Sequence, residues 1–187
     1  MIDSVYITES EMTFVIPDLQ NLFHIEKSDF YQKIGPSVKT TEFIYLGNDC
    51  HLQFIEAKKS CPNVNNREES KEKEENYERY YSDLTEKFID SLNILAAILL
   101  KKYGRPSEAF GDGGQCISEL DSLYNTRIRF ILVIKTAEES WLGGCKTELE
   151  RRLLSMRKIW KADVIVLNEK LAAKKGFVRI EEKSAQV

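Results

Sequence analysis

Histidine and cysteine are scarce and scattered in this sequence, and their scarcity excludes the usual zinc sites. There are two histidines, His24 and His51, and four cysteines, with no C-x-x-C spacing. Structural zinc sites usually present their ligands as close Cys or His pairs, so no such site is expected. Scattered cysteines without a disulfide pattern indicate reduced thiols, and we therefore predict a cytoplasmic protein.

Long apolar runs are also missing. The longest spans residues 94–100, far short of the roughly 20 residues that cross a bilayer, so no membrane partner is expected. The first residues lack the basic and apolar regions of a secretory signal. A net charge of −3 argues against strong non-specific binding to nucleic acid, although it leaves room for a local basic patch.

The composition that remains is that of an ordinary globular protein. The chain has 187 residues, of which 42% are hydrophobic and 30% are charged. A chain of this length buries enough surface to fold as one domain, and we expect a single domain over residues 1–187. The charged stretch 62–75 and the glycine-rich stretch 105–125 are expected to be loops. The glycines of the second stretch lack the Lys-Ser/Thr of a phosphate-binding loop.

The N-terminal third has the pattern of β-structure. Runs of β-forming residues at 5–8 and 12–16 predict one hairpin. A second hairpin is predicted from 38–46 and 50–59, which flank Gly47-Asn48-Asp49, a typical turn sequence. Between the two hairpins, Ser28-Asp29 is a suitable start for a short helix.

The rest of the chain alternates helices with strands. From residue 76 to 103 apolar side chains recur every three or four residues, which predicts a long helix. A strand at 128–134, a helix at 145–160 and a strand at 163–167 predict a βαβ unit with parallel strands. A short helix and an edge strand at 177–180 would follow. The expected fold class is mixed α/β (α+β), with an antiparallel hairpin, a long helix and a βαβ unit.

The second hairpin carries the residues with the clearest chemistry. Because side chains alternate along a strand, Glu56 and Lys58 share a face with the apolar residues before them. On the partner strand, Glu42 stands among apolar neighbours. With a three-residue loop at 47–49, Glu42 lies opposite Phe54 and diagonal to Glu56, with Cβ atoms roughly 7–8 Å apart.

The length of the turn decides whether this site exists. A two-residue loop at Asn48-Asp49 would pair Glu42 with Ile55 and place it on the other face. We predict the three-residue loop, because it gives the hairpin one coherent apolar face. Glu42 and Glu56 are then candidate ligands for Mg²⁺ or Mn²⁺, and Lys58 is a candidate for orienting a water molecule.

A hairpin that ends in Glu56-Ala57-Lys58 and is followed by a helix and a later strand resembles the PD-(D/E)XK nuclease superfamily, which has the restriction-endonuclease-like fold. Glu42 matches the first acidic position, and Glu56 and Lys58 match the second acidic position and the lysine. The resemblance implies a Mg²⁺-dependent nuclease that cleaves DNA or RNA, in defence or nucleic-acid processing. Where the family usually has Asp, this chain has Glu42. Where the family begins with a helix that often carries another acid, it offers Glu26 or Asp29.

Two other interpretations remain open. The chain could be a catalytically silent nuclease-like module that binds a protein partner, a second copy of itself or nucleic acid through 67–79 and 105–125. It could also be an unrelated α/β protein in which Glu-x-Lys is incidental.

Several other residues have both a functional and a plain structural reading. Lys87 and Asp90 are either site residues or part of a solvated helix face, and the solvated face is favoured. His51 alternates onto the face opposite Glu56 and is read as structural. The basic residues of the βαβ helix could contact phosphates or form an ordinary amphipathic surface; they are Arg151, Arg152, Arg157, Lys158 and Lys161.

Overall fold

A five-stranded sheet with the order β3-β4-β5-β6-β7 forms the centre of the protein. The structure, a computed structural model, describes residues 4–35, 37–111, 113–119 and 126–180. The strands of this sheet are β3 (Leu22–Phe23), β4 (Phe43–Leu46), β5 (His51–Lys58), β6 (Arg127–Ile134) and β7 (Asp163–Asn168). β4 runs antiparallel to β3 and β5, whereas β5, β6 and β7 are parallel. The predicted mixed α/β class, with its hairpin and βαβ unit, is confirmed.

A second, antiparallel sheet lies on one face of the first. It has the order β1-β2-β8 and consists of β1 (Val5–Glu9), β2 (Met12–Ile16) and β8 (Val178–Arg179). The predicted N-terminal hairpin is therefore confirmed. The strand predicted at 177–180 exists, but it pairs with β2.

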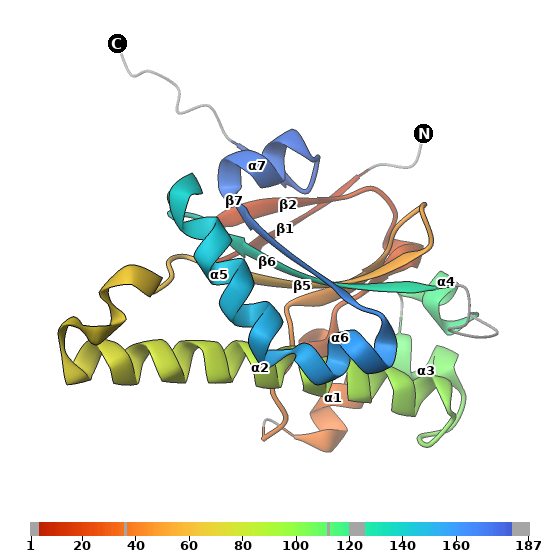
Figure 1. Cartoon of the computed structure of the whole chain (residues 1–187). Helices are drawn as coiled ribbons and strands as arrows, with labels where there is room; N and C mark the ends of the chain where they lie inside the picture. The colour runs from red at the N-terminus through yellow and green to blue at the C-terminus, as the bar shows by residue number, and fades with distance from the viewer. Residues whose placement is uncertain (1–3, 36, 112, 120–125, 181–187) are drawn as a thin grey trace, which may run out of the picture.

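Helices cover the other face of the central sheet, where α2 (Lys71–Leu99) and α5 (Glu139–Arg152) cross the strands (Figure 1). α6 (Leu154–Trp160) continues α5 toward β7, and α7 (Glu169–Lys174) leads from β7 to β8. The shorter helices are α1 (Asp29–Ile34), α3 (Pro106–Phe110), α4 (Gln115–Ser118) and the 3-10 helices η1 (Leu19–Asn21), η2 (Ile25–Lys27) and η3 (Val64–Glu69).

Each face of the central sheet has its own apolar core. Even-numbered residues of β5 and β6, such as Phe54 and Phe130, pack against α2 and α5. Odd-numbered residues, such as Ile55 and Ile131, pack against the β1-β2-β8 sheet. This division follows from strand alternation, and it explains why β5 and β6 carry buried apolar residues on both of their faces. Glu56 is even-numbered and therefore lies on the helical side.

The long helix packs as its apolar spacing predicts. Leu84, Phe88, Leu92 and Leu95 are all fully buried. The Phe88 ring lies 5.1 Å from that of Phe130 and so joins the centre of α2 to the sheet. α2 starts at Lys71, because Ser70 caps it by accepting a hydrogen bond from the backbone N–H of Lys73.

Parts of two segments that were predicted to be loops are helical. The charged stretch 62–75 contains η3 and the first turn of α2, because Lys and Glu favour helix even without an apolar face. The stretch 105–125 contains α3, which has a proline in its first turn, and α4. Positions 112 and 120–125 of this stretch lie outside the described residues. The predicted helix 145–160 begins earlier, at Glu139, and is interrupted at Leu153.

In the part of the chain that the structure describes, no helix combines the length and the apolar character needed to cross a membrane.

Candidate functional site

The β4–β5 turn has the predicted length but lies one residue further along the chain. Gly47 N–H donates to the carbonyl oxygen of His51 (2.9 Å), so the loop is 48–50. Leu46 pairs with Leu52 and Ile44 with Phe54, so the predicted position of Glu42 opposite Phe54 is wrong. The reason is that Cys50 adopts the left-handed conformation (φ 57°) that closes a three-residue hairpin loop. A Cβ at position 47 would lie 2.7 Å from the side-chain nitrogen of Gln53, so the Gln53 side chain would have to shift.

The corrected register gives Glu42 a different partner, but Glu42 stays on the face of the sheet that carries Glu56. Ile44 pairs with Phe54 and Phe43 with Ile55. If this register is continued by one residue beyond the start of β4, Glu42 lies opposite Glu56. The arrangement that would have separated the two carboxylates, Glu42 opposite Ile55, is not the one observed.

Glu56 is a completely buried carboxylate near the end of β5. Its Oε1 accepts a hydrogen bond from Lys87 Nζ (2.8 Å) and forms an ion pair with Lys58 Nζ (2.9 Å). Its Oε2 is buried and has no hydrogen-bond partner in the described part of the chain. Burial raises the pKa of Glu56, and the charges of Lys87 and Lys58 oppose that rise. A buried carboxylate with one oxygen unpaired is costly, and such groups often mark functional sites.

Lys87 belongs to this cluster, and its assignment to a solvated face of α2 was wrong. Only 16% of its side chain is exposed. Burial by itself would lower the pKa of Lys87, but the Glu56 charge and hydrogen bond raise it above its ordinary value. Among the described residues of α2, Lys87 and not Asp90 contacts Glu56. The available signal was that Lys87 adjoins Phe88 and follows Leu84 by almost one helical turn, at the edge of the apolar face.

An acidic residue of α2, Asp83, also borders the cluster. Asp83 Oδ2 lies 4.0 Å from Lys58 Nζ, and Asp83 Oδ1 lies 3.0 Å from Lys39 Nζ. Sequence reasoning missed Asp83, which precedes Lys87 by one helical turn. Lys58 therefore stands between Glu56 and Asp83, with 26% of its side chain exposed. It is the more exposed of the two lysines that contact Glu56.

Glu42 lies beside this cluster, and contacts of the preceding residue, Thr41, fix the chain there. The backbone N–H of Thr41 donates to the hydroxyl of Ser91 on α2 (2.8 Å), and the two hydroxyls are also bonded. Burial raises the pKa of Glu42 to about 7, with the Glu56 carboxylate as the next cause. Glu9 and Glu26 add to the rise, while Lys87 opposes it. Glu26 thus contributes negative charge here, and Asp29 is not among the groups that act on Glu42.

The raised pKa of Glu42 predicts a pH-dependent stability. Between pH 4.5 and 7 the folded protein keeps a proton on Glu42 that the unfolded chain has released. The free energy of unfolding should therefore fall as pH rises through this window. Glu42→Gln should remove this dependence. Its free energy of unfolding should exceed that of the wild type by about 1–2 kcal/mol between pH 5 and 8, after allowance for the partial exposure of Glu42.

Urea unfolding of both proteins at pH 5 and pH 8 measures this difference. Glu75→Gln, at an exposed position of α2, is the control and should follow the wild-type pH dependence. An unchanged pH dependence in Glu42→Gln would show that Glu42 is not the titrating group.

The carboxylates can serve as ligands for a hard divalent cation. The described residues contain no group of three or more His, Cys, Asp or Glu side chains arranged to hold a metal ion. Mg²⁺ commonly needs only one or two protein carboxylates, because it keeps several water molecules and binds substrate phosphates. The unpaired Oε2 of Glu56 and the neighbouring Glu42 carboxylate fit that requirement.

The basic residues of α5 and α6 are largely engaged within the protein. Arg151 and Arg152 both bind the buried Glu148, and Arg152 also reaches Glu78 on α2 at 2.7 Å. Arg157 lies 3.3 Å from Glu150. Arg152 thus joins α5 to α2 and Arg157 joins α6 to α5, whereas Arg151 pairs within α5, which favours the structural reading. His51 is buried, and its Nδ1 lies 2.8 Å from Asp49 Oδ2.

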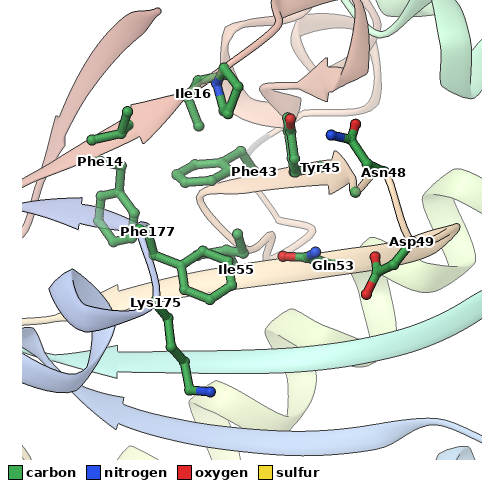
Figure 2. Close-up of a pocket in the computed structure, with 14 residues that line it drawn as sticks. Phe14, Ile16, Phe43, Tyr45, Asn48, Asp49, Gln53, Ile55, Lys175 and Phe177 are labelled. Atoms are coloured by element: carbon green, nitrogen blue, oxygen red, sulfur yellow. The ribbon is translucent and has the colours of Figure 1, made fainter.

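A separate hollow of about 320 Å³ lies between the two sheets. Figure 2 shows its apolar side, with Phe14, Phe43 and Phe177 around Ile55, and its polar end, where Gln53 and Asp49 adjoin the β4–β5 turn. Ile55 and Gln53 are odd-numbered residues of β5. The hollow therefore opens on the face of the sheet turned away from Glu56, and it takes no part in the carboxylate–lysine cluster.

Comparison of the chain with protein-family models, with curated proteins and with solved structures found no match.

Proposed function

We propose that the protein is a metal-dependent nuclease of the PD-(D/E)XK type, which hydrolyses phosphodiester bonds in DNA or RNA. The observation that carries the proposal is the Glu56 carboxylate, buried at the end of β5, bonded to Lys58 and level with Glu42. The hairpin, the following long helix and the later parallel strand are in the order that the resemblance requires. Lys87 adds a second cation next to the carboxylates.

Each residue of the cluster has a role in this reaction. Glu42 and Glu56 would hold Mg²⁺ or Mn²⁺, and their closeness adds to the rise in the pKa of Glu42 that burial causes. The ion, when bound, supplies Lewis acidity toward the phosphate and lowers the pKa of a water molecule. Lys58, the more exposed lysine, orients the attacking water and donates to the negative charge that develops on the phosphate. Lys87 is a positioning residue that holds Glu56 in its rotamer.

Binding of Mn²⁺ provides the first test. Isothermal titration of the wild-type protein should show saturable binding, and Glu56→Gln should lose at least tenfold in affinity. Glu148→Gln is a matched control, because Glu148 is also a buried glutamate bonded to two cations. That variant should bind Mn²⁺ as the wild type does.

Cleavage is then measured on single-stranded DNA, double-stranded DNA and RNA with Mg²⁺ or Mn²⁺ present. Degradation that chelation abolishes and that Glu56→Gln lacks is the expected result. A wild-type protein that neither binds Mn²⁺ nor cleaves any of these substrates would overturn the proposal.

The alternative function is that of a nuclease-like module without activity, which engages nucleic acid or a protein partner. The observation that favours it is that Lys58 and Lys87 already share Oε1 of Glu56, so the carboxylate is neutralised without a metal ion. Nucleic-acid binding that needs no divalent cation, with no cleavage, would support this alternative.

A further inference from the structure

Two cysteines that are distant in the sequence meet beside the candidate site. Cys61 follows the end of β5, and Cys145 lies on the buried side of α5. Their sulfur atoms are 3.8 Å apart, and both cysteines are free thiols. A disulfide needs its sulfurs at about 2.05 Å, so a shift of less than 2 Å would join them.

Cys61 is reachable from solvent, whereas Cys145 is not. Cys61 lines a hollow of about 560 Å³ together with Arg79, Tyr80 and Asp83. Cys145 is completely buried behind it. An oxidant that enters the hollow therefore meets the Cys61 sulfur first, and the second thiol stands within reach to complete the reaction.

The contact also favours a thiolate within the pair, which such a reaction needs. A hydrogen bond from the Cys61 thiol lowers the pKa of Cys145 to about 7, with a smaller contribution from the Tyr81 hydroxyl, and together they outweigh the effect of burial. The same contact, together with burial, raises the pKa of Cys61. The thiolate therefore forms on Cys145, and the reactive Cys61 thiolate arises when the Cys61 proton passes across the contact to Cys145.

We propose that Cys61 and Cys145 are a reversible oxidation site, which forms an intramolecular disulfide in response to hydrogen peroxide or an organic hydroperoxide. The site is independent of the proposed nuclease activity, although the disulfide would tie the segment after Lys58 to α5. Disulfides in reducing compartments are usually transient and regulatory, in agreement with the free thiols of the resting protein.

The reaction is a two-electron oxidation of the thiols in two steps. The Cys61 thiolate attacks one oxygen of the peroxide, so that an S–O bond forms, the O–O bond breaks, and the departing oxygen takes up a proton as water or alcohol. Cys61 is then a sulfenic acid. Cys145 loses its proton and attacks the Cys61 sulfur; the S–S bond forms, the S–O bond breaks, and hydroxide leaves with that proton as water. A thiol reductant reverses the change.

The local structure permits the required movement. Backbone hydrogen bonds from Lys135 and Thr136 to the carbonyl oxygens of Lys58 and Lys59 fix the chain up to Lys59. Residues 60–63 are not part of a helix or strand. Cys61 can therefore move toward the rigid α5 without breaking the β5–β6 pairing.

Peptide mapping after oxidation tests the proposal directly. Reduced protein is treated with hydrogen peroxide, quenched with catalase, denatured and alkylated before mass spectrometry. We expect the number of alkylated cysteines to fall from four to two, with Cys61 and Cys145 recovered in one linked peptide that dithiothreitol separates. The linked form should also unfold at a higher temperature, because the unfolded chain is constrained.

Matched variants separate this pair from the remaining thiols. The double variant Cys50→Ser/Cys116→Ser should still form the link, whereas Cys61→Ser and Cys145→Ala should each fail to form it. Should Cys145→Ala not fold, Cys61→Ser carries the test, because Cys61 is partly exposed. Recovery of Cys61 and Cys145 as separate alkylated or sulfonic-acid peptides after oxidation of the wild type would overturn the proposal, as would a link to Cys50 or Cys116.

Discussion

Lys58→Ala should lower the rate of phosphodiester cleavage by at least about a hundredfold while leaving the fold intact. The reason is that Lys58 is the more exposed of the two lysines that contact Glu56, and removing one donor to a developing negative charge typically costs about 10²–10³ in rate. Mn²⁺ binding should persist, since a lysine is not a metal ligand. The measurement is single-turnover cleavage of the best substrate, with thermal unfolding as a check on the fold.

Lys59→Ala is the matched control for this prediction. Lys59 is the next residue, but it pairs with Glu11 and 63% of its side chain is exposed. Its removal should leave the cleavage rate within about twofold of wild type. Wild-type cleavage by Lys58→Ala would remove Lys58 from the mechanism, and equal losses in both variants would indicate a general electrostatic effect.

Phe88→Ala should reduce the free energy of unfolding by about 3–5 kcal/mol. Phe88 is completely buried at the point where α2 crosses the sheet, and its ring packs against Phe130. Loss of the ring leaves a cavity that the surrounding strands and helix cannot fill without distortion. Urea denaturation followed by circular dichroism gives the value.

Leu100→Ala provides the comparison, because Leu100 lies at the end of the same helix and is 71% exposed. That change should alter stability by no more than about 0.5 kcal/mol. A small effect for both variants would mean that α2 does not pack on the sheet as described.

The sequence predicted the elements whose pattern is local and long. The apolar spacing of α2 identified its buried face from Tyr77 to Leu95, because a helix repeats its geometry over many turns. The predicted end at residue 103 was wrong, because the helix ends at Leu99 and Tyr103 is exposed. The apolar runs of β6 and β7 likewise predicted a buried parallel unit, although the parallel pairing of β5 with β6 was not predicted. The presence and the length of the β4–β5 loop were also predicted from the sequence.

The position of that loop could not be predicted from the sequence, because it depends on Cys50 adopting a left-handed conformation that cysteine rarely takes. The face of Glu42 was nevertheless predicted, since a shift of the loop by one residue moves the pairing by two and preserves the alternation.

The contacts of Lys87 and Asp83 with the cluster could not be predicted, since they depend on how α2 crosses β5. No local pattern encodes the distance between a helix side chain and a strand side chain that is far away in sequence. The same applies to Cys61 and Cys145. The two-residue strand β8 was recognised, but its partner was not, because so short a strand carries no pairing information.

The pairing of β8 with β2 has a consequence for the order of folding. Thr13 pairs with Arg179 and Phe14 with Val178, so the smaller sheet joins segments from opposite ends of the described chain. Contacts of such high sequence separation raise the contact order and slow the search for the native state. During synthesis the β1–β2 hairpin must wait until nearly the whole described chain has emerged from the ribosome. We therefore expect slow final docking of β8, seen as late amide protection at Phe14 and Val178 in pulse-labelled refolding, after the α2-covered core has formed.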